Sequence, residues 1–374
     1  MPMRVLYNAD YPLSGDRVLL YYPPTEVTLE DAVAATSHIV SSAARPSEKA
    51  HPALAIFRLK EPAISLGRFQ HPHVALNAAA GLPVPVVRRL TGGPATWMGA
   101  GSVYLSLVIP NWPLWFPSAG VRGLPKLVHD LVLGALRKDG FSLSMSAADS
   151  VTKRGFEVGR MGFDVVDATA LVELELGMSE SVALPEEHNG YPALSEEAFP
   201  RRTRHLAELL EARELPSFPL PFATSVAEAL FREKFEVRES AFSWLERTRI
   251  EGLRQRFVEA EAAPASPATS GPELMSRPHE DYIGFVHAAV IFNAQMQFSS
   301  VRIFGDFLAD SPGIAELEHR LRWTEVSRRN VAQIIDEVLG APGHIILGLK
   351  RLGSVLDAIM DAASRHDRWD AMNN

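Results

Sequence analysis

Short apolar runs alternate with segments of helical periodicity along most of the chain. Apolar runs bounded by polar residues, glycine or proline are typical of strands, and they predict strands at residues 16–22, 53–59, 63–67, 84–89, 103–109 and 168–176. Apolar residues at helical spacing predict helices at residues 29–44, 124–138, 201–213 and 225–233. Thr28, three residues before Asp31, is a suitable N-cap for the first helix. This irregular alternation predicts an α+β fold, with a mixed sheet flanked by helices.

Residues 262–272 divide the sequence into two parts. Their sequence, AAPASPATSGP, consists of small residues and prolines that form no packed element, which is typical of a flexible linker. The pattern after the linker predicts two strands and three helices, at residues 282–290, 295–305, 312–322, 328–339 and 348–364. We therefore expect a large domain at residues 1–261, a linker at 262–272 and a small α+β domain at 273–374.

Composition narrows the class of protein. The chain has 374 residues, of which 47% are hydrophobic and 22% charged, as in globular proteins with a sizeable core. Its net charge of -8 favours neither nucleic acid nor an anionic membrane as a partner. The absence of cysteine excludes disulfides, zinc–thiolate sites and a thiol nucleophile. We see neither a signal peptide nor a run of about 18 apolar residues, so we expect a cytoplasmic protein.

A pair of arginines precedes a glycine-rich turn. Arg88 and Arg89 end a predicted strand and are followed by Thr91, Gly92 and Gly93. Glycines let backbone N–H groups approach an anion closely, and guanidinium groups bind phosphate or carboxylate. The alternative interpretation is that the arginines form surface ion pairs and the glycines only turn the chain.

Two separated segments resemble one family. EPAISLGRFQHPHVALN (61–77) followed by PVVRRLTGG (85–93) resembles the lipoate-protein ligases, and SVRIFGDFLADSPGIAELEHRL (300–321) resembles their accessory domain. The resemblance implies a biotin/lipoate ligase-like fold and ATP- and Mg²⁺-dependent activation of lipoate or a related acyl acid as its adenylate. It also implies transfer of the acyl group to a lysine of a lipoyl-type carrier protein domain. The ligand-binding residues that it implies are Gly67, Arg68, Arg88, Arg89, Thr91, Gly92 and Gly93.

The sequence departs from the family pattern at positions that carry chemistry. Pro94 replaces a third glycine and has no N–H to donate, while Met98 and Gly99 stand where the family has a histidine and an acid. The family also has a lysine whose ammonium group stabilises charge between acyl carboxylate and phosphate. That position falls on Met161 or, with a shift of one residue, on Arg160. Arg160 is thus the candidate catalytic residue, and Met161 a candidate ligand-binding residue.

These departures leave two functions open. The first is a ligase in which Arg160 acts in place of the lysine. The second is a ligase-fold protein without ligase activity that binds an acyl ligand, a nucleotide or a partner ligase. A cysteine-dependent acyltransferase is excluded by composition, and a biotin ligase is disfavoured because no GRGRRG loop is present.

Metal binding has little support in the sequence. His71 and His73 have a spacing that can chelate a metal, but no acidic partner stands at a recognisable distance. Asp149 and Asp164 could orient a nucleotide-bound magnesium, although isolated acids are usually solvated surface groups. We therefore predict no resident metal site.

Overall fold

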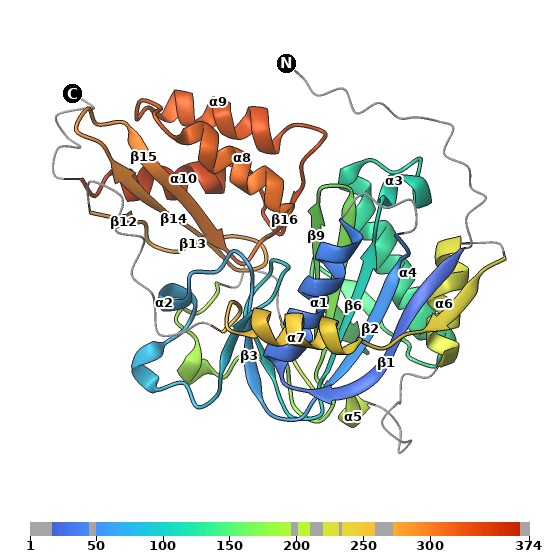
Figure 1. Ribbon diagram of the computed structural model, residues 1–374. Helices are drawn as coiled ribbons and strands as arrows, with labels where there is room; N and C mark the ends of the chain where they lie inside the picture. The colour runs from blue at the N-terminus through green and yellow to red at the C-terminus, as the bar shows by residue number, and fades with distance from the viewer. Residues whose placement is uncertain are drawn as a thin grey trace.

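An eight-stranded sheet forms the centre of the larger part of the protein (Figure 1). The computed structural model describes residues 17–44, 50–195, 201–209, 220–231, 234–258 and 272–366. Along the sheet the strands follow the order β11 (Glu236–Glu239), β1 (Val18–Val27), β2 (Ala53–Leu59), β6 (Val103–Ile109), β10 (Thr169–Leu176), β9 (Phe156–Val166), β8 (Ser150–Lys153) and β7 (Ser144–Ser146). β11, β1 and β2 pair in parallel and the remaining neighbours are antiparallel. The predicted mixed sheet is confirmed.

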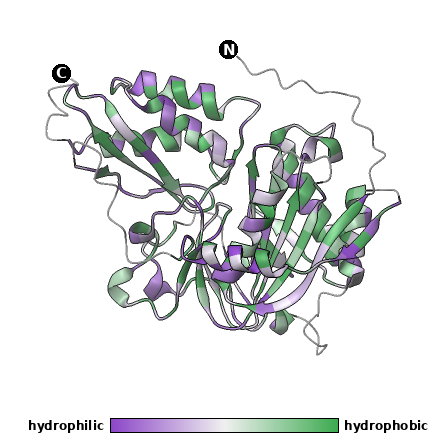
Figure 2. Ribbon diagram, viewed as in Figure 1, coloured by the Kyte–Doolittle hydropathy of each residue, from purple (hydrophilic) through white to green (hydrophobic). Residues whose placement is uncertain are grey.

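Helices cover both faces of this sheet. On one face α4 (Leu124–Lys138) and α6 (Leu220–Phe231) share a core with inward side chains such as Leu105 and Leu107 of β6. On the other face α1 (Leu29–Ala43) and α7 (Trp244–Arg254) pack against Tyr104 and Val108 of the same strand. The two-residue period of β6 thus supplies both cores, and Figure 2 shows its ribbon in the hydrophobic colour.

A smaller sheet carries the glycine-rich turn. It consists of β4 (Val86–Arg88), β3 (Ala63–Leu66) and β5 (Thr96–Met98), with β3 parallel to β4 and antiparallel to β5. Residues 90–95, called the glycine loop below, connect β4 to β5. Short helices complete this part of the protein: α2 (Pro72–Ala75), α3 (Trp112–Trp115), α5 (Leu206–Leu209), and 3-10 turns at Ala78–Ala80, Val121–Gly123 and Glu186–His188.

The C-terminal domain, residues 272–366, has its own sheet and core. β14 (Phe285–Phe292) pairs with β15 (Phe298–Gly305), β12 (Leu274–Met275) and β13 (His279–Glu280). The helices α8 (Ser311–Leu321), α9 (Arg328–Leu339) and α10 (Gly353–Ala363) share one hydrophobic core with this sheet. A short ribbon, β16 (Leu308–Ala309) with β17 (Ile346–Leu347), lies near the larger domain (Figure 1). The predicted hairpin and three helices are confirmed.

Some predictions extend beyond the described residues. The linker at 262–272 lies outside them except for residue 272, so the domain boundary stays a prediction. The helix predicted at 201–213 is helical at Leu206–Leu209 within the described residues, which exclude 210–213. The helix predicted at 225–233 begins earlier, at Leu220, and residues 232–233 are not described. Within the described ranges, no helix has the length and apolar character needed to cross a membrane.

Candidate functional site

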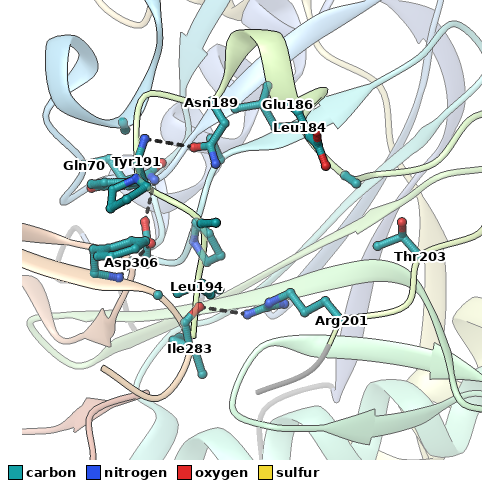
Figure 3. Close-up of a pocket in the computed structure, with 18 of the residues that line it drawn as sticks. Gln70, Leu184, Glu186, Asn189, Tyr191, Leu194, Arg201, Thr203, Ile283 and Asp306 are labelled. Atoms are coloured by element: carbon teal, nitrogen blue, oxygen red, sulfur yellow. Dashed lines mark hydrogen bonds between the residues drawn. The ribbon is translucent and has the colours of Figure 1, made fainter. Parts of the chain in front are cut away.

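A cavity of about 730 Å³ lies between the large domain and the C-terminal domain (Figure 3). This volume falls in the range of small-molecule sites. Four parts of the described chain supply the wall: residues 70–75, the glycine loop with β9, residues 183–195 with 201–203, and the C-terminal domain. The lining includes Gln70, Pro94, Ala95, Arg160, Glu186, Asn189, Tyr191, Leu194, Ser195, Arg201, Thr203, Ile283, Phe285 and Asp306.

Arg160 enters the cavity wall from β9. Its Nε donates to Glu157 Oε1 at 2.7 Å, and its Nη1 donates to the carbonyl oxygen of Ala95 at 2.7 Å. Successive side chains of a strand point to opposite faces, so Met161 lies on the other face, fully buried against the core that contains α4. Of the two positions that the sequence offered for the family's lysine, only Arg160 borders the cavity.

Arg201 is a second buried guanidinium in the wall. Its Nη1 donates to Glu157 Oε2 at 3.0 Å, and its Nη2 donates to Asp149 Oδ1 at 3.1 Å and to the Ile283 carbonyl at 3.2 Å. Figure 3 shows it reaching toward Ile283 of the C-terminal domain. Burial opposes ionisation of Glu157, but the two guanidinium groups outweigh that effect and lower its pKa to about 2. No local sequence pattern marked Arg201.

The arginine pair of the motif holds backbone rather than an open site. Arg88 Nη1 donates to the carbonyls of Gly67 at 3.1 Å, Arg68 at 2.9 Å and Gln70 at 2.7 Å. Arg89 is 3% exposed, and its Nη2 donates to the Gly92 and Pro94 carbonyls at 2.8 and 3.0 Å. Both side chains therefore fix the loops on either side of β3, and neither lines the cavity.

The glycines of the motif allow the protein's own backbone to pack closely. A Cβ on Gly67 would lie 1.9 Å from the Gly93 carbonyl oxygen, and one on Gly92 would lie 2.4 Å from the Phe307 carbonyl oxygen. The Gly93 N–H donates to that same Phe307 carbonyl at 3.0 Å. The backbone amide expected to face an anion thus pairs with the C-terminal domain.

Buried carboxylates on β10 hold the glycine loop from behind. The Thr91 N–H and hydroxyl donate to Glu173 Oε2 at 2.9 and 2.7 Å, and the Tyr104 hydroxyl also donates to Glu173. Burial raises the pKa of Glu173 despite these donors. Glu175, two residues along the strand, lies 3.6 Å from Arg89 Nη1. Thr91, a predicted ligand-binding residue, is therefore fully buried on the side of the loop that contacts β10.

Arg68 and two aspartates lie at the boundary of the domains. Arg68 Nη1 is 3.9 Å from Asp164 Oδ2, and Asp164 accepts hydrogen bonds from the Ser311 N–H and hydroxyl at 2.8 and 2.5 Å. Asp306 accepts from Gln70 Nε2 at 2.6 Å and from the Phe285 N–H at 3.0 Å. Burial raises the pKa of both aspartates to about 6.

The residues that depart from the family pattern are packed against other parts of the protein. Met98 is fully buried in the core beneath α1, and a Cβ on Gly99 would lie 2.5 Å from Glu180 Cδ. Asp149, considered above for magnesium, is paired with Arg201. His71 and His73 have ring centroids 5.6 Å apart, and the described part of the chain contains no group of three or more histidine or acidic residues that could hold a metal ion.

The mixed sheet has helices on both faces, and a small C-terminal sheet domain lies beside it. This arrangement is the biotin/lipoate ligase-like fold. Residues 30–171 match the family model "Lipoyl protein ligase A/B catalytic domain". The matched region includes the arginine pair, the glycine loop and Arg160. A comparison with curated proteins found no match.

P. falciparum LipL1 in complex with lipoate shows the same fold at low sequence identity. It superimposes with a TM-score of 0.60 at 12% identity, covering 91% of this chain and 98% of that one. A bi-partite lipoate protein ligase from Thermoplasma acidophilum, studied with its E2 lipoyl domain, has 14% identity and a TM-score of 0.45 over 66% of this chain and 94% of that one. A lipoate-protein ligase A bound with ATP has 14% identity and a TM-score of 0.47, covering 65% and 95%.

Proposed function

We propose that this lipoate-ligase-like protein binds a lipoyl-type acyl group in the interdomain cavity, with its polar end at Arg160, and does not form an acyl-adenylate. The observation that carries the proposal is that the hydrogen-bond donors expected to bind a nucleotide are already paired within the protein. The arginine pair, the Gly93 amide and Arg160, all candidates for an anionic nucleotide, already donate to oxygen atoms of the protein.

A nucleotide would have to displace hydrogen bonds that the protein already makes. Phosphate groups bind where N–H groups and cations face a ligand. Here a phosphate would have to take the Gly93 amide from the Phe307 carbonyl, and the charge of Arg160 is already balanced by Glu157, whose Oε1 lies 2.7 Å from Arg160 Nε. Loss of the Gly93 bond leaves a buried acceptor unpaired, at a cost of about 1–3 kcal/mol. Pro94 offers no amide in compensation. An acyl chain in the cavity requires no such exchange and adds no charge.

A second candidate is an active lipoate-protein ligase. It is favoured by Arg160, a cationic side chain that borders the cavity from within the matched catalytic-domain region. In this function ATP with Mg²⁺ would activate lipoate or a related acid, Arg160 would stabilise the developing charge, and a lysine of a lipoyl-type carrier domain would receive the acyl group. LipL1, which shares the fold and was solved in complex with lipoate, supports lipoate as the acid.

Two measurements on the full chain separate these functions. Isothermal titration calorimetry with lipoate, lipoamide and octanoate measures acyl binding, and a pyrophosphate-release assay with ATP, Mg²⁺ and each acid measures adenylate formation. We expect saturable binding of at least one lipoyl compound and no acid-dependent pyrophosphate release. Release with lipoate that disappears in Arg160→Gln but persists in Arg204→Gln would establish the ligase instead. Arg204 is the control because it is an exposed arginine that does not line the cavity.

A further inference from the structure

We infer that the cavity selects an acyl group in neutral amide linkage over a free carboxylic acid, and that Glu157 is the residue that sets this selectivity. The inference rests on the proposed function, because it concerns which acyl compound enters the cavity. It follows from the charges around Arg160 and from the hydrogen-bonding groups that face the cavity.

The cations of the wall are already neutralised. Glu157 lies between the two guanidinium groups, with Oε1 at 2.7 Å from Arg160 Nε and Oε2 at 3.0 Å from Arg201 Nη1. Asp149 adds a second carboxylate, 3.1 Å from Arg201 Nη2. Two positive and two negative charges therefore cancel, and all four groups are largely buried.

Among the described residues, the other charged residues of the lining are acidic. Asp306 borders the cavity close to Gln70, and Glu186 stands at its exposed side. A ligand carboxylate would bring a further negative charge beside buried guanidinium groups whose charges the described carboxylates already balance. A neutral ligand avoids that electrostatic cost. The wall is therefore suited to an amide or ester rather than to an acid.

The cavity also offers groups that match an amide. Among the described residues no hydrogen bond involves Arg160 Nη2, which leaves N–H groups for an amide carbonyl. The hydroxyl of Tyr191 is buried and has no hydrogen-bond partner in the described part of the chain. Its ring stacks on Phe285 with centroids 4.7 Å apart, which fixes it in the wall. The hydroxyl oxygen therefore keeps a lone pair that an amide N–H can fill.

The rim of the cavity leaves space for the group beyond the amide. Asn189, Leu194 and Ser195 line the cavity and are exposed to solvent, and Figure 3 shows Asn189 and Leu194 on the same segment as Tyr191. An amide-linked acyl chain has a second substituent on nitrogen that must leave the cavity. The ligand class is thus an acyl chain bound through an amide to an amine, such as a lysine side chain of a carrier domain.

The test compares lipoamide with lipoate by isothermal titration calorimetry at pH 7.5, using the full chain. We expect the parent to bind lipoamide at least tenfold more tightly than lipoate. Glu157→Gln and Asp149→Asn each remove one negative charge beside Arg201, so each should shift this ratio about tenfold or more toward lipoate. Glu228→Gln is the matched control, because Glu228 is exposed and pairs with Lys138 away from the cavity. It should leave the ratio unchanged.

Thermal melts show which variants are folded. Glu157→Gln and Asp149→Asn each remove one negative charge beside Arg201, so one folded variant is sufficient for the test. A parent that binds lipoate as tightly as lipoamide would overturn the inference while leaving the proposed acyl binding intact. Folded Glu157→Gln and Asp149→Asn proteins that keep the parental ratio would remove the role of Glu157. A parent that binds neither probe would refute the proposed function itself, and the selectivity with it.

Discussion

Arg160 and Met161 are neighbours on β9, yet they lie in opposite environments. Arg160 borders the cavity and is bonded to Glu157, whereas Met161 is fully buried among the apolar side chains beneath α4. The difference follows from the alternation of side chains along a strand. A residue shift that is invisible in a motif comparison therefore decides whether a side chain meets a ligand or the core.

This placement predicts opposite outcomes for lysine at the two positions. Met161→Lys would place an ammonium group in an apolar core without a partner, so we expect a loss of roughly 3 kcal/mol or more in the free energy of unfolding. Arg160→Lys keeps a cation next to Glu157 and should cost less. Urea denaturation of both variants and the parent measures the difference. A Met161→Lys protein as stable as Arg160→Lys would contradict the assigned faces of β9.

At the scale of elements, the start of α8 is joined to β9 by a buried carboxylate. Asp164 on β9 accepts hydrogen bonds from the N–H and hydroxyl of Ser311, the first residue of α8, and Arg68 is the cation that faces it. Burial raises the pKa of Asp164 from its ordinary value near 4 to about 6, although Arg68 and Ser311 act in the opposite direction. The carboxyl group of Asp164 thus binds a proton more tightly in the native state than in the unfolded state.

The contact should therefore depend on pH in a defined direction. Between pH 4 and 6 the native state holds more protons at Asp164 than the unfolded state, so its contribution to stability falls as pH rises and levels off above pH 6. Asp164→Asn removes this dependence, and the Ser311 hydroxyl can rotate to accept from the new amide. Relative to the parent, we expect the variant to gain on the order of 2 kcal/mol between pH 4.5 and 7.

Urea denaturation of parent and variant at both pH values measures this gain. Other shifted groups, such as Asp306, His129 and His287, are present in both proteins, so their effects largely cancel in the difference. A difference in stability that stays constant from pH 4.5 to 7 would show that Asp164 does not titrate in this range.

The sequence predicted most accurately those elements whose apolar residues follow a regular strand or helix period. Residues 103–109, 124–138 and 328–339 form β6, α4 and α9 with the predicted bounds, because their apolar period reflects a single buried face or a fully buried strand. Thr28 caps α1 as expected, accepting from the Asp31 N–H. In these segments local preference and tertiary packing agree.

Other elements could not be recognised because their partners are distant in sequence. β9 contains Arg160, Gly162 and Asp164, which look like loop residues until the glycine loop and the C-terminal domain provide their contacts. α7 starts with a capping box at Ser243 and Glu246, but only Ile250 of this helix is buried, so its apolar period is weak. In the candidate site, Arg201 was missed for the same reason, since its carboxylate partners belong to β9 and to the turn before β8.

At the scale of the whole molecule, the C-terminal domain contacts the large domain at several separate points. The Gly305 N–H donates to the Phe69 carbonyl at 3.0 Å, and Phe69 stacks on Phe307 with centroids 5.2 Å apart. At a separate point Arg122 Nη2 donates to the carbonyls of Gly340 and Ala341, which follow α9. These contacts do not depend on the peptide connection between the domains.

We therefore predict that cleavage of the connection leaves the two domains associated. Elastase suits the experiment because residues 262–272 are rich in alanine and serine and contain no lysine or arginine. Brief digestion should cut first within 262–272, and both fragments should elute together from a size-exclusion column under native conditions. Mass spectrometry of the fragments locates the cut. Early cleavage within 85–110, with 262–272 intact, would contradict the predicted domain boundary.

Arg122 provides a sensitive variant for the association of the cleaved fragments. A guanidinium group at the C-terminal end of a helix interacts favourably with the last carbonyls and with the helix dipole, so Arg122→Ala should weaken the fragment complex by about 1–2 kcal/mol, or roughly 5- to 30-fold in Kd. Lys126→Ala is the matched control, because Lys126 is an exposed cation of the same region that pairs with Asp130 inside the large domain. Dilution of cleaved protein before chromatography measures the Kd. Equal dissociation of the Arg122→Ala and Lys126→Ala complexes would show that Arg122 does not hold the C-terminal domain. Separation of the parental fragments at micromolar concentration would show that the peptide connection holds the two domains together.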